Sequence, residues 1–125
     1  MAAILAVDDQ KVMRDLVNAV LAAEGHQVTT AEDGVEALAL AREHSFDLVL
    51  SDINMPNMNG ISLVSKLRRL DHFEGVPIIM LTTESGDFKK DKAKKLGANG
   101  WLLKPFEPER LVNAVNVTLQ KAGKA

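Results

Sequence analysis

The residues best suited to chemistry in this chain follow short apolar runs. They are two adjacent aspartates, a third aspartate, two adjacent threonines and a lysine: Asp8, Asp9, Asp52, Thr82, Thr83 and Lys104. If the apolar runs are parallel strands, their carboxyl ends meet at one edge of a sheet, and open α/β sheets bind ligands there. We therefore expect three carboxylates, hydroxyl groups and one ammonium to converge at that edge.

Three neighbouring carboxylates repel one another and raise one another's pKa. A hard divalent cation removes that penalty, and Mg²⁺ prefers oxygen ligands, usually one or two carboxylates with phosphate oxygens. Lys104 offers a point charge for a phosphoryl group. The set predicts Mg²⁺-dependent phosphoryl transfer, with Asp52 as the nucleophile because a carboxylate can form an acyl phosphate. Asp8 and Asp9 are better placed to hold the metal.

Each of these residues also has an ordinary structural interpretation. Asp8 or Asp9 would cap the helix that follows, and Asp52 would begin a turn. Thr82 would be a strand-end threonine and Lys104 a solvated lysine. Taken singly, most of these side chains fit the ordinary interpretation as well or better. The expected convergence of all of them at one edge favours the chemical interpretation.

The elements that must position these residues alternate in type. Short apolar runs predict strands, and longer amphipathic segments predict helices. The expected strands are 3–7, 27–30, 46–51, 77–81 and 100–103, and the expected helices are 11–24, 34–44, 61–70, 87–96 and one beginning near Pro108. This order predicts an α/β fold with a doubly wound, five-stranded parallel sheet and five helices. The weakly apolar strand 27–30 fits an edge position.

The apolar faces of the helices follow from the spacing of their apolar residues. For helices 11–24 and 34–44, the residues expected on those faces are Val12, Leu16, Val20 and Ala23, and Val35, Leu38 and Ala39. For helix 61–70 and the last helix, they are Leu63, Val64 and Leu67, and Leu111, Val112, Val115 and Leu119.

The composition excludes several classes of protein. The 125 residues suit one domain over 1–125, and 46% apolar residues are enough for a core. A net charge of −2 argues against a dedicated nucleic-acid binder, and the absence of cysteine excludes disulfides and thiolate metal sites. The apolar runs are too short to span a bilayer. We expect a cytoplasmic protein with no membrane or nucleic-acid partner.

Four segments resemble the response regulator receiver family, and within it the chemotaxis CheY-type proteins. They are Ile4-Leu-Ala-Val-Asp-Asp9, Asp52-Ile-Asn-Met-Pro-Asn-Met-Asn-Gly60, Met80-Leu-Thr-Thr-Glu84 and Gly97-Ala-Asn-Gly-Trp-Leu-Leu-Lys-Pro-Phe106. Each motif is weak alone, but the four together are specific and cover essentially the whole chain. The resemblance implies a flavodoxin-like fold with strand order 2-1-3-4-5, an order that general accounts of this fold give for CheY itself.

The resemblance also implies roles at the metal. Asp52 would accept a phosphoryl group from a histidine kinase. Asp9, Asp52 and the main-chain carbonyl of Asn54 would bind Mg²⁺ directly, whereas Asp8 would act mainly through water. Two further residues, Thr83 and Glu84, would join Asn54 in tuning the lifetime of the phosphate. In Thr83 the chain departs from the family, where a smaller residue is common.

The remaining implied roles concern the switch. Lys104 would pair with the phosphoryl group, and Thr82 would move to hydrogen-bond it. Trp101, which stands where the family usually has Tyr or Phe, would change rotamer with Thr82. That change would reshape the face formed by helix 87–96, strand 100–103 and the last helix. The peptide bond before Pro105 would be cis.

The resemblance implies a monomeric, single-domain response regulator of a two-component chemotaxis pathway. It would not be an enzyme beyond self-catalysed phosphotransfer and autodephosphorylation. Its partners would be a chemotaxis-type histidine kinase, a flagellar motor switch protein and a phosphatase. The alternatives are a phosphate sink or adaptor in a non-flagellar pathway, a Mg²⁺-dependent phosphatase and an unphosphorylated pseudo-receiver. Asn54 argues against the phosphatase, which needs a second acid at that position.

Overall fold

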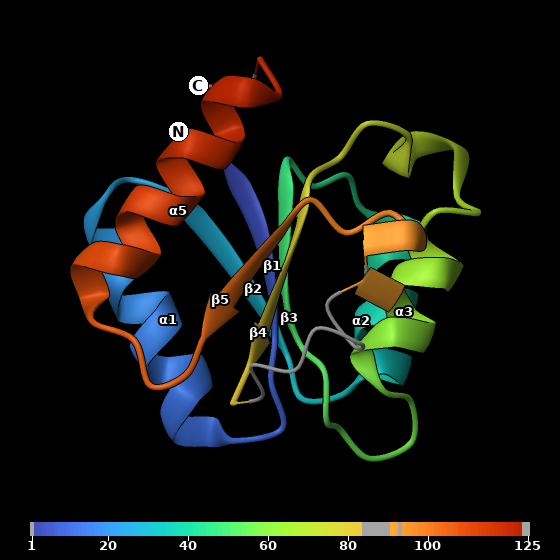
Figure 1. The fold of residues 1–125 in the computed structure, drawn as a ribbon, viewed down its shortest axis with the longest axis horizontal. Helices are drawn as coiled ribbons and strands as arrows, with labels where there is room; N and C mark the ends of the chain where they lie inside the picture. The colour runs from blue at the N-terminus through green and yellow to red at the C-terminus, as the bar shows by residue number, and fades with distance from the viewer. Residues whose placement is uncertain (1, 84–90, 93, 124–125) are drawn as a thin grey trace.

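The computed structural model describes residues 2–83, 91–92 and 94–123, and these form a sheet covered by helices on both faces (Figure 1). All five strands are parallel, in the order β2-β1-β3-β4-β5. The strands are β1 Ala3–Val7, β2 Gln27–Ala31, β3 Leu48–Asp52, β4 Ile78–Thr82 and β5 Gly100–Leu103. The predicted fold class, strand order and edge position of the second strand are therefore confirmed.

The helices lie in two layers, α1 and α5 on one face of the sheet and α2 and α3 on the other (Figure 1). Their bounds are α1 Lys11–Ala23, α2 Gly34–Glu43, α3 Gly60–Leu67 and α5 Pro108–Lys121, with a short 3₁₀ helix at Asp71–Phe73. Of the helix expected at 87–96, residues 91–92 and 94–95 are helical, and 87–90 and 93 lie outside the described residues.

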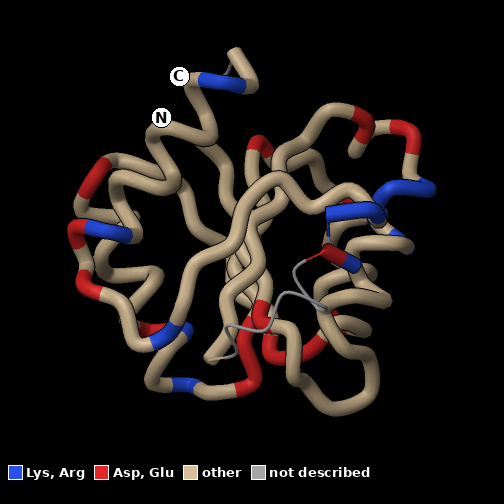
Figure 2. The backbone as a smooth tube through the Cα atoms, viewed as in Figure 1, with Lys and Arg blue, Asp and Glu red and all other residues tan. Residues whose placement is uncertain are grey.

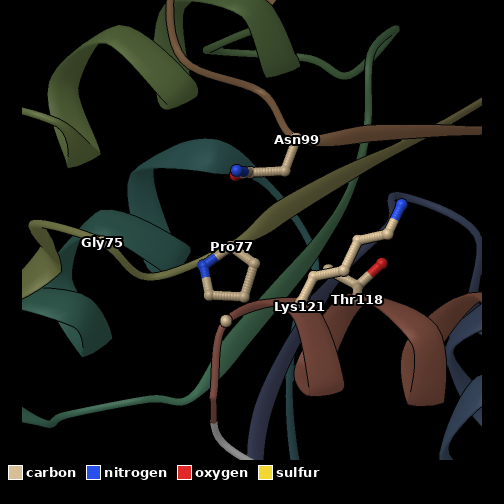
Figure 3. Close-up of a pocket in the computed structure, with 6 residues that line it drawn as sticks. Gly75, Pro77, Asn99, Thr118 and Lys121 are labelled. Carbon is tan, nitrogen blue, oxygen red and sulfur yellow. The ribbon is translucent and has the colours of Figure 1, made fainter.

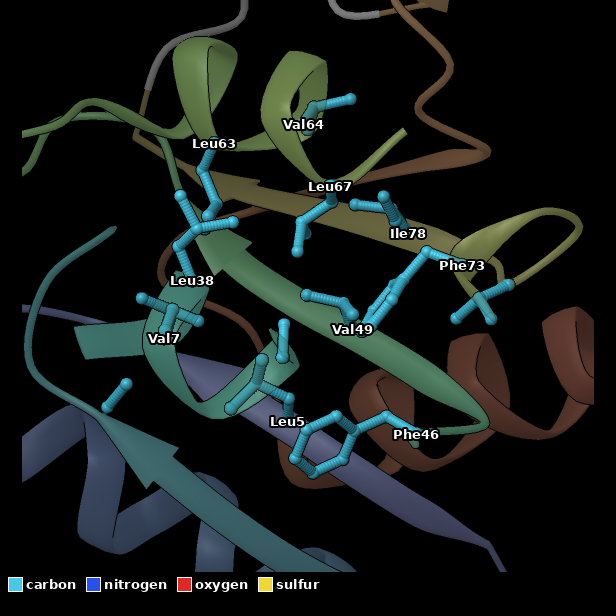
Figure 4. Packing of buried hydrophobic residues seen from close by; sticks show 14 of the residues in the cluster. Leu5, Val7, Leu38, Phe46, Val49, Leu63, Val64, Leu67, Phe73 and Ile78 are labelled. Carbon is cyan, nitrogen blue, oxygen red and sulfur yellow. The ribbon is translucent and has the colours of Figure 1, made fainter. Parts of the chain in front are cut away.

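The two faces of the sheet bury separate apolar clusters, because successive strand side chains point to opposite faces. In β1, Leu5 and Val7 join the cluster beneath α2 and α3, whereas Ile4 and Ala6 join the one beneath α1 and α5. Figure 4 shows the first cluster, in which side chains from α2, α3 and the strands β1 to β4 meet. Burial on both sides explains why the strands are apolar throughout rather than alternating.

The predicted inner face of α1 was wrong at Val12, Leu16 and Ala23, whereas Val20 is half-buried against the cluster beneath α1 and α5. Val12 is 82% exposed and Leu16 is 37% exposed, whereas Val17 and Leu21 are buried. Helix α1 carries two overlapping apolar stripes at i, i+4 spacing, and its contact with the sheet selects the one that contains Val17 and Leu21. The stripe with Val12 and Leu16 faces outward.

The inner face of α2 also differs from the prediction. Leu38 is buried as expected, but Val35 is 53% exposed and Ala39 is exposed. Ala37 and Ala41 are buried instead. Two alanines separated by one turn let the helix axis approach the sheet closely, so the small residues face inward.

The last two helices match their predictions closely. The three residues expected to face inward in α3 are fully buried: Leu63, Val64 and Leu67. In α5, Leu111, Val115 and Leu119 are buried and Val112 is half-buried. Pro108 occupies the first turn, where its missing N–H costs nothing. Within the described parts of the chain, no helix is long and apolar enough to cross a membrane.

Candidate functional site

The carboxyl edge of the sheet holds the candidate site because four strands end there side by side. Asp52 is the last residue of β3 and Thr82 the last of β4. Asp8 follows β1 directly, and Lys104 follows β5 directly. The backbone N–H of Lys104 donates to the carbonyl of Thr82 at 2.7 Å, so the β5 end is tied to the β4 end.

Three carboxylates come together at this edge. One oxygen from each of Asp8, Asp9 and Asp52 lies within 4.8 Å of the other two. Asp8 and Asp52 are 3% and 7% exposed, whereas Asp9 is exposed to solvent. Acidic segments gather at the corresponding lower edge of the sheet in Figure 2. The cluster thus has two buried carboxylates and one at its entrance, all with the hard oxygen donors that suit Mg²⁺.

Lys104 joins the buried carboxylates. Its Nζ lies 2.6 Å from Asp8 Oδ2 and 3.5 Å from Asp52 Oδ2, and its side chain is 9% exposed. The sequence predicted that Lys104 reaches the site but did not predict that Asp8 is its nearer partner. One ammonium faces three carboxylates, so the cluster retains excess negative charge.

That excess is visible at Asp52. Burial raises the pKa of the Asp52 carboxyl, and the charges of Asp8 and Asp9 raise it further. Lys104 and the N–H of Ile53, which donates to Asp52 Oδ1 at 2.8 Å, act in the opposite direction without cancelling the rise. A bound cation would neutralise this negative charge and remove the repulsion between the carboxylates.

The loop after Asp52 is held in place by close packing. A Cβ on Gly60 would clash with the carbonyl oxygen of Asp52, so this position excludes any side chain. Asn57 has a φ of 69°, and its amide donates to Asp33 Oδ2 at 3.0 Å. Asn54, the candidate carbonyl ligand, is an exposed residue of this same loop.

The remaining predicted residues lie around this cluster. Thr82 is fully buried, and Thr83, the next residue, is exposed. Trp101 is half-buried against the cluster beneath α2 and α3. Its Nε1 is buried and has no hydrogen-bond partner within the described part of the chain. The Lys104–Pro105 peptide bond is cis. Glu84 lies outside the described residues.

The capping interpretation of the first two aspartates is wrong. The N-cap of α1 is Gln10, which makes no side-chain capping bond. Asp8 Oδ1 instead accepts from the N–H of Gln10 at 3.0 Å within the turn. The sequence reasoning also missed Arg14, whose NH1 donates to the carbonyl of Asp8 at 2.8 Å. No motif signals this contact, because it joins a helix side chain to a main-chain oxygen.

A separate pocket lies at the opposite end of the sheet (Figure 3). It measures about 350 Å³ and is lined by Gly75, Pro77, Asn99, Thr118, Lys121 and Ala122. It shares no residue with the acidic cluster. The chemistry predicted from the sequence therefore belongs to the carboxyl edge and not to this pocket.

Comparison with known proteins agrees with the geometry. The family described as the response regulator receiver domain matches residues 4–116. The chain belongs to this family. The predicted resemblance is thereby confirmed, and the chain is a receiver-domain signalling protein of CheY type rather than a classical enzyme.

Individual receiver proteins show how far the similarity extends. The chain is 42% identical over 110 residues to the chemotaxis protein CheY homolog of Campylobacter jejuni, covering 86% of this chain and 85% of that protein. The structure of Vibrio cholerae CheY4 superposes with a TM-score of 0.93 at 45% identity, covering 95% of this chain and 99% of that one. A probable transcriptional regulator, ycf29 of Porphyra purpurea, is 36% identical over 112 residues, covering 90% of this chain but only 54% of the relative.

Proposed function

We propose that this receiver accepts a phosphoryl group on Asp52 from a histidine kinase in a Mg²⁺-dependent reaction. The observation that carries the proposal is the grouping of three carboxylates within 4.8 Å beside the Lys104 ammonium. The chain has no GxxxxGK[ST] motif, so a nucleotide is not the expected phosphate source. The proposed donor is a phosphorylated histidine kinase, and a small acyl phosphate would serve in its place.

Each residue of the cluster would have a distinct role. Asp9 and Asp52, with the carbonyl of Asn54, would hold Mg²⁺ directly, and Asp8 would act mainly through water. Bound Mg²⁺ supplies charge neutralisation at the carboxylates and the phosphoryl oxygens. Asp52 attacks the phosphorus atom and forms the acyl phosphate, while the donor imidazole leaves. Lys104 then pairs with the new phosphoryl group.

Lys104 would have to exchange its present partner when Asp52 is phosphorylated. Its 2.6 Å contact with Asp8 is shorter than its 3.5 Å distance to Asp52. Charge neutralisation of Asp8 would weaken the attraction between Asp8 and Lys104. The Lys104 ammonium would then be available for the phosphoryl group on Asp52, which carries the larger negative charge.

The output would be a protein contact through the face formed by helix 87–96, β5 and α5. Thr82 would turn towards the phosphoryl group, and Trp101 would follow. The Nε1 of Trp101 is buried and has no acceptor within the described residues, so a change of rotamer would break no indole hydrogen bond to them.

The pathway we propose is chemotaxis, with a cytoplasmic, monomeric, single-domain regulator acting over residues 1–125. The support is the similarity to proteins named chemotaxis protein CheY. The partners would be a chemotaxis-type histidine kinase, a flagellar motor switch protein and a phosphatase. Asn54, Thr83 and Glu84 would tune the lifetime of the phosphate. The alternative output is that of a phosphate sink or adaptor in a non-flagellar pathway.

Intact mass after incubation with acetyl phosphate tests the proposed chemistry. With Mg²⁺ we expect a gain of one phosphoryl group, and without Mg²⁺ or in Asp52→Ala we expect none. No gain in the unaltered protein would be followed by a histidine-kinase donor and by beryllofluoride. Failure with all three reagents would contradict the proposal and favour a pseudo-receiver.

Binding to a flagellar motor switch peptide separates the two outputs. The chemotaxis proposal predicts that the beryllofluoride-treated protein binds this peptide more tightly than the untreated protein. An Asp52→Ala variant given the same treatment is the matched control. Equal, weak binding in both states, alongside normal phosphorylation, would favour the sink or adaptor.

A further inference from the structure

The turn between β1 and α1 carries two of the three carboxylates but has no side-chain N-cap. Gln10 makes no capping bond, and the first turn of α1 contains no acidic residue. In contrast, Asp33 caps α2 and Asn59 caps α3 through side-chain oxygens at 2.8 Å. The position of Asp8 and Asp9 must therefore be fixed by other contacts.

The N–H of Asp8 donates to the carbonyl of Ala31 at 3.1 Å, and three side-chain contacts are made at Asp8 within the described residues. Two of them use its carboxylate, which accepts from the N–H of Gln10 at 3.0 Å and from Lys104 Nζ at 2.6 Å. The third uses its main chain, because Arg14 NH1 donates to the carbonyl oxygen of Asp8 at 2.8 Å. A cation at the cluster competes for the carboxylate but leaves the carbonyl free to keep its partner. The Arg14 contact is the one of the three that is compatible with both states.

We infer that Arg14 is a positioning residue for the metal site, an inference that rests on the proposed function. By holding the carbonyl of Asp8 from the second turn of α1, the half-buried guanidinium sets the direction in which the Asp8 and Asp9 side chains leave the chain. Residues that orient metal ligands in this way commonly change metal affinity by about 10–100-fold when they are removed.

The positive charge of Arg14, considered alone, predicts the opposite change in Mg²⁺ affinity when Arg14 is removed. A guanidinium near the cluster repels a divalent cation, so removing the charge alone would tighten Mg²⁺ binding. If the arginine were merely solvated, its removal would change nothing. The direction of the change in Mg²⁺ affinity thus distinguishes positioning from both other roles.

The test is an NMR titration of the full chain with Mg²⁺, following the backbone amides of Gln10 and Ile53. Arg14→Met should raise the Kd on the order of tenfold. Arg14→Lys, which keeps a donor of similar reach, should stay close to the unaltered protein. Arg42→Met removes the same charge from an exposed position on α2 and should have no effect. An unchanged or lower Kd in Arg14→Met would overturn the inference.

Two further measurements keep the result unambiguous. Arg14→Gln, neutral and shorter, should also raise the Kd, so the test does not depend on Arg14→Met folding. Acetyl phosphate labelling of either variant should be slow at low Mg²⁺ and recover at saturating Mg²⁺, because Asp52 itself is unaltered. If the unaltered protein bound no Mg²⁺, the proposed function would fail. If it bound Mg²⁺ and all the variants matched it, only the role of Arg14 would fail.

Discussion

The two ends of the sheet use polar side chains in opposite ways. At the amino edge, side chains of intervening segments accept hydrogen bonds from N–H groups at or just before the start of a strand. The N–H of Ala2 donates to His26 Nδ1 at 3.1 Å, that of Ala3 to Asp47 Oδ2 at 2.9 Å and that of Ile78 to Asn99 Oδ1 at 2.9 Å. At the carboxyl edge, three carboxylates crowd around one ammonium. The first arrangement provides hydrogen-bond acceptors for backbone N–H groups, and the second concentrates negative charge.

Two cationic side chains, Arg68 near the amino edge and Lys104 at the carboxyl edge, show the same contrast. Arg68 donates to the carbonyls of Gly97 and Phe73 and to Asn99 Oδ1, at 2.8–3.2 Å. Lys104 faces the carboxylates of Asp8 and Asp52. Removing Arg68 breaks hydrogen bonds that tie together the segments before β4 and β5, whereas removing a carboxylate near Lys104 relieves repulsion between carboxylates. We therefore expect substitutions at the amino edge to lower stability and one at the carboxyl edge to raise it.

The largest effect should come from Arg68→Met. The substitution removes the donor of the Gly97 carbonyl, while the Phe73 carbonyl keeps its bond from the Val76 N–H at 3.2 Å. Loss of the hydrogen bonds made by the guanidinium should lower the free energy of unfolding by about 2–4 kcal/mol. Urea denaturation measures it. Arg69→Met is the matched control, because Arg69 is its exposed neighbour. Equal effects of the two substitutions would contradict the assignment of Arg68 to the fold.

Asn99→Ala should have a smaller effect of the same sign. It removes the acceptor of the Ile78 N–H, the first N–H of β4, and one partner of Arg68. The expected loss is about 1–3 kcal/mol, the cost of one unsatisfied buried donor. Urea denaturation again provides the number. The substitution should leave labelling of Asp52 by acetyl phosphate unchanged, since Asn99 lies at the opposite edge; a loss of labelling would break the comparison.

Asp52→Asn should stabilise the metal-free protein, on the order of 1 kcal/mol at neutral pH. The folded pKa of Asp52 is raised, so its ionisation costs stability as pH rises through that pKa. The gain from Asn should therefore be present above the folded pKa and vanish below the unfolded pKa of about 4. Denaturation in EDTA at neutral pH and at a pH below the unfolded pKa measures the difference in stability between the variant and the unaltered protein. A variant less stable than the unaltered protein at neutral pH would show that repulsion does not dominate.

The smallest effect should be at His26. Burial and the positive charge of the N-terminus lower the pKa of His26. Since its folded pKa lies below its unfolded value of about 6.5, the protein should lose stability as pH falls through the unfolded pKa towards the folded one. His26→Gln should lose less over that window. Thermal unfolding across the window, with His44→Gln as an exposed control, tests this. An unchanged pH slope would show that His26 is not the group responsible.

Much of the fold and of the site could be predicted because it depends on residues close together in the chain. Apolar runs bounded by turn residues indicated the strands, and the residues after them indicated the acidic cluster, since parallel strands bring their ends to one edge. The order of the strands came from the family resemblance rather than from the pattern. The grouping of Asp8, Asp9 and Asp52 followed from topology without any knowledge of distances.

The contacts between distant segments could not be predicted in the same way. The choice between two apolar stripes on α1 depended on where that helix lies on the sheet. The pairing of Lys104 with Asp8 joins residues 96 apart, and the Arg68 contact with Gly97 joins residues 29 apart. Such partners are selected by packing, because a long cation can reach any of several nearby acceptors and its sequence neighbours do not record which one is close. The amino acid pattern thus specified where charge would gather, and folding specified which charges touch.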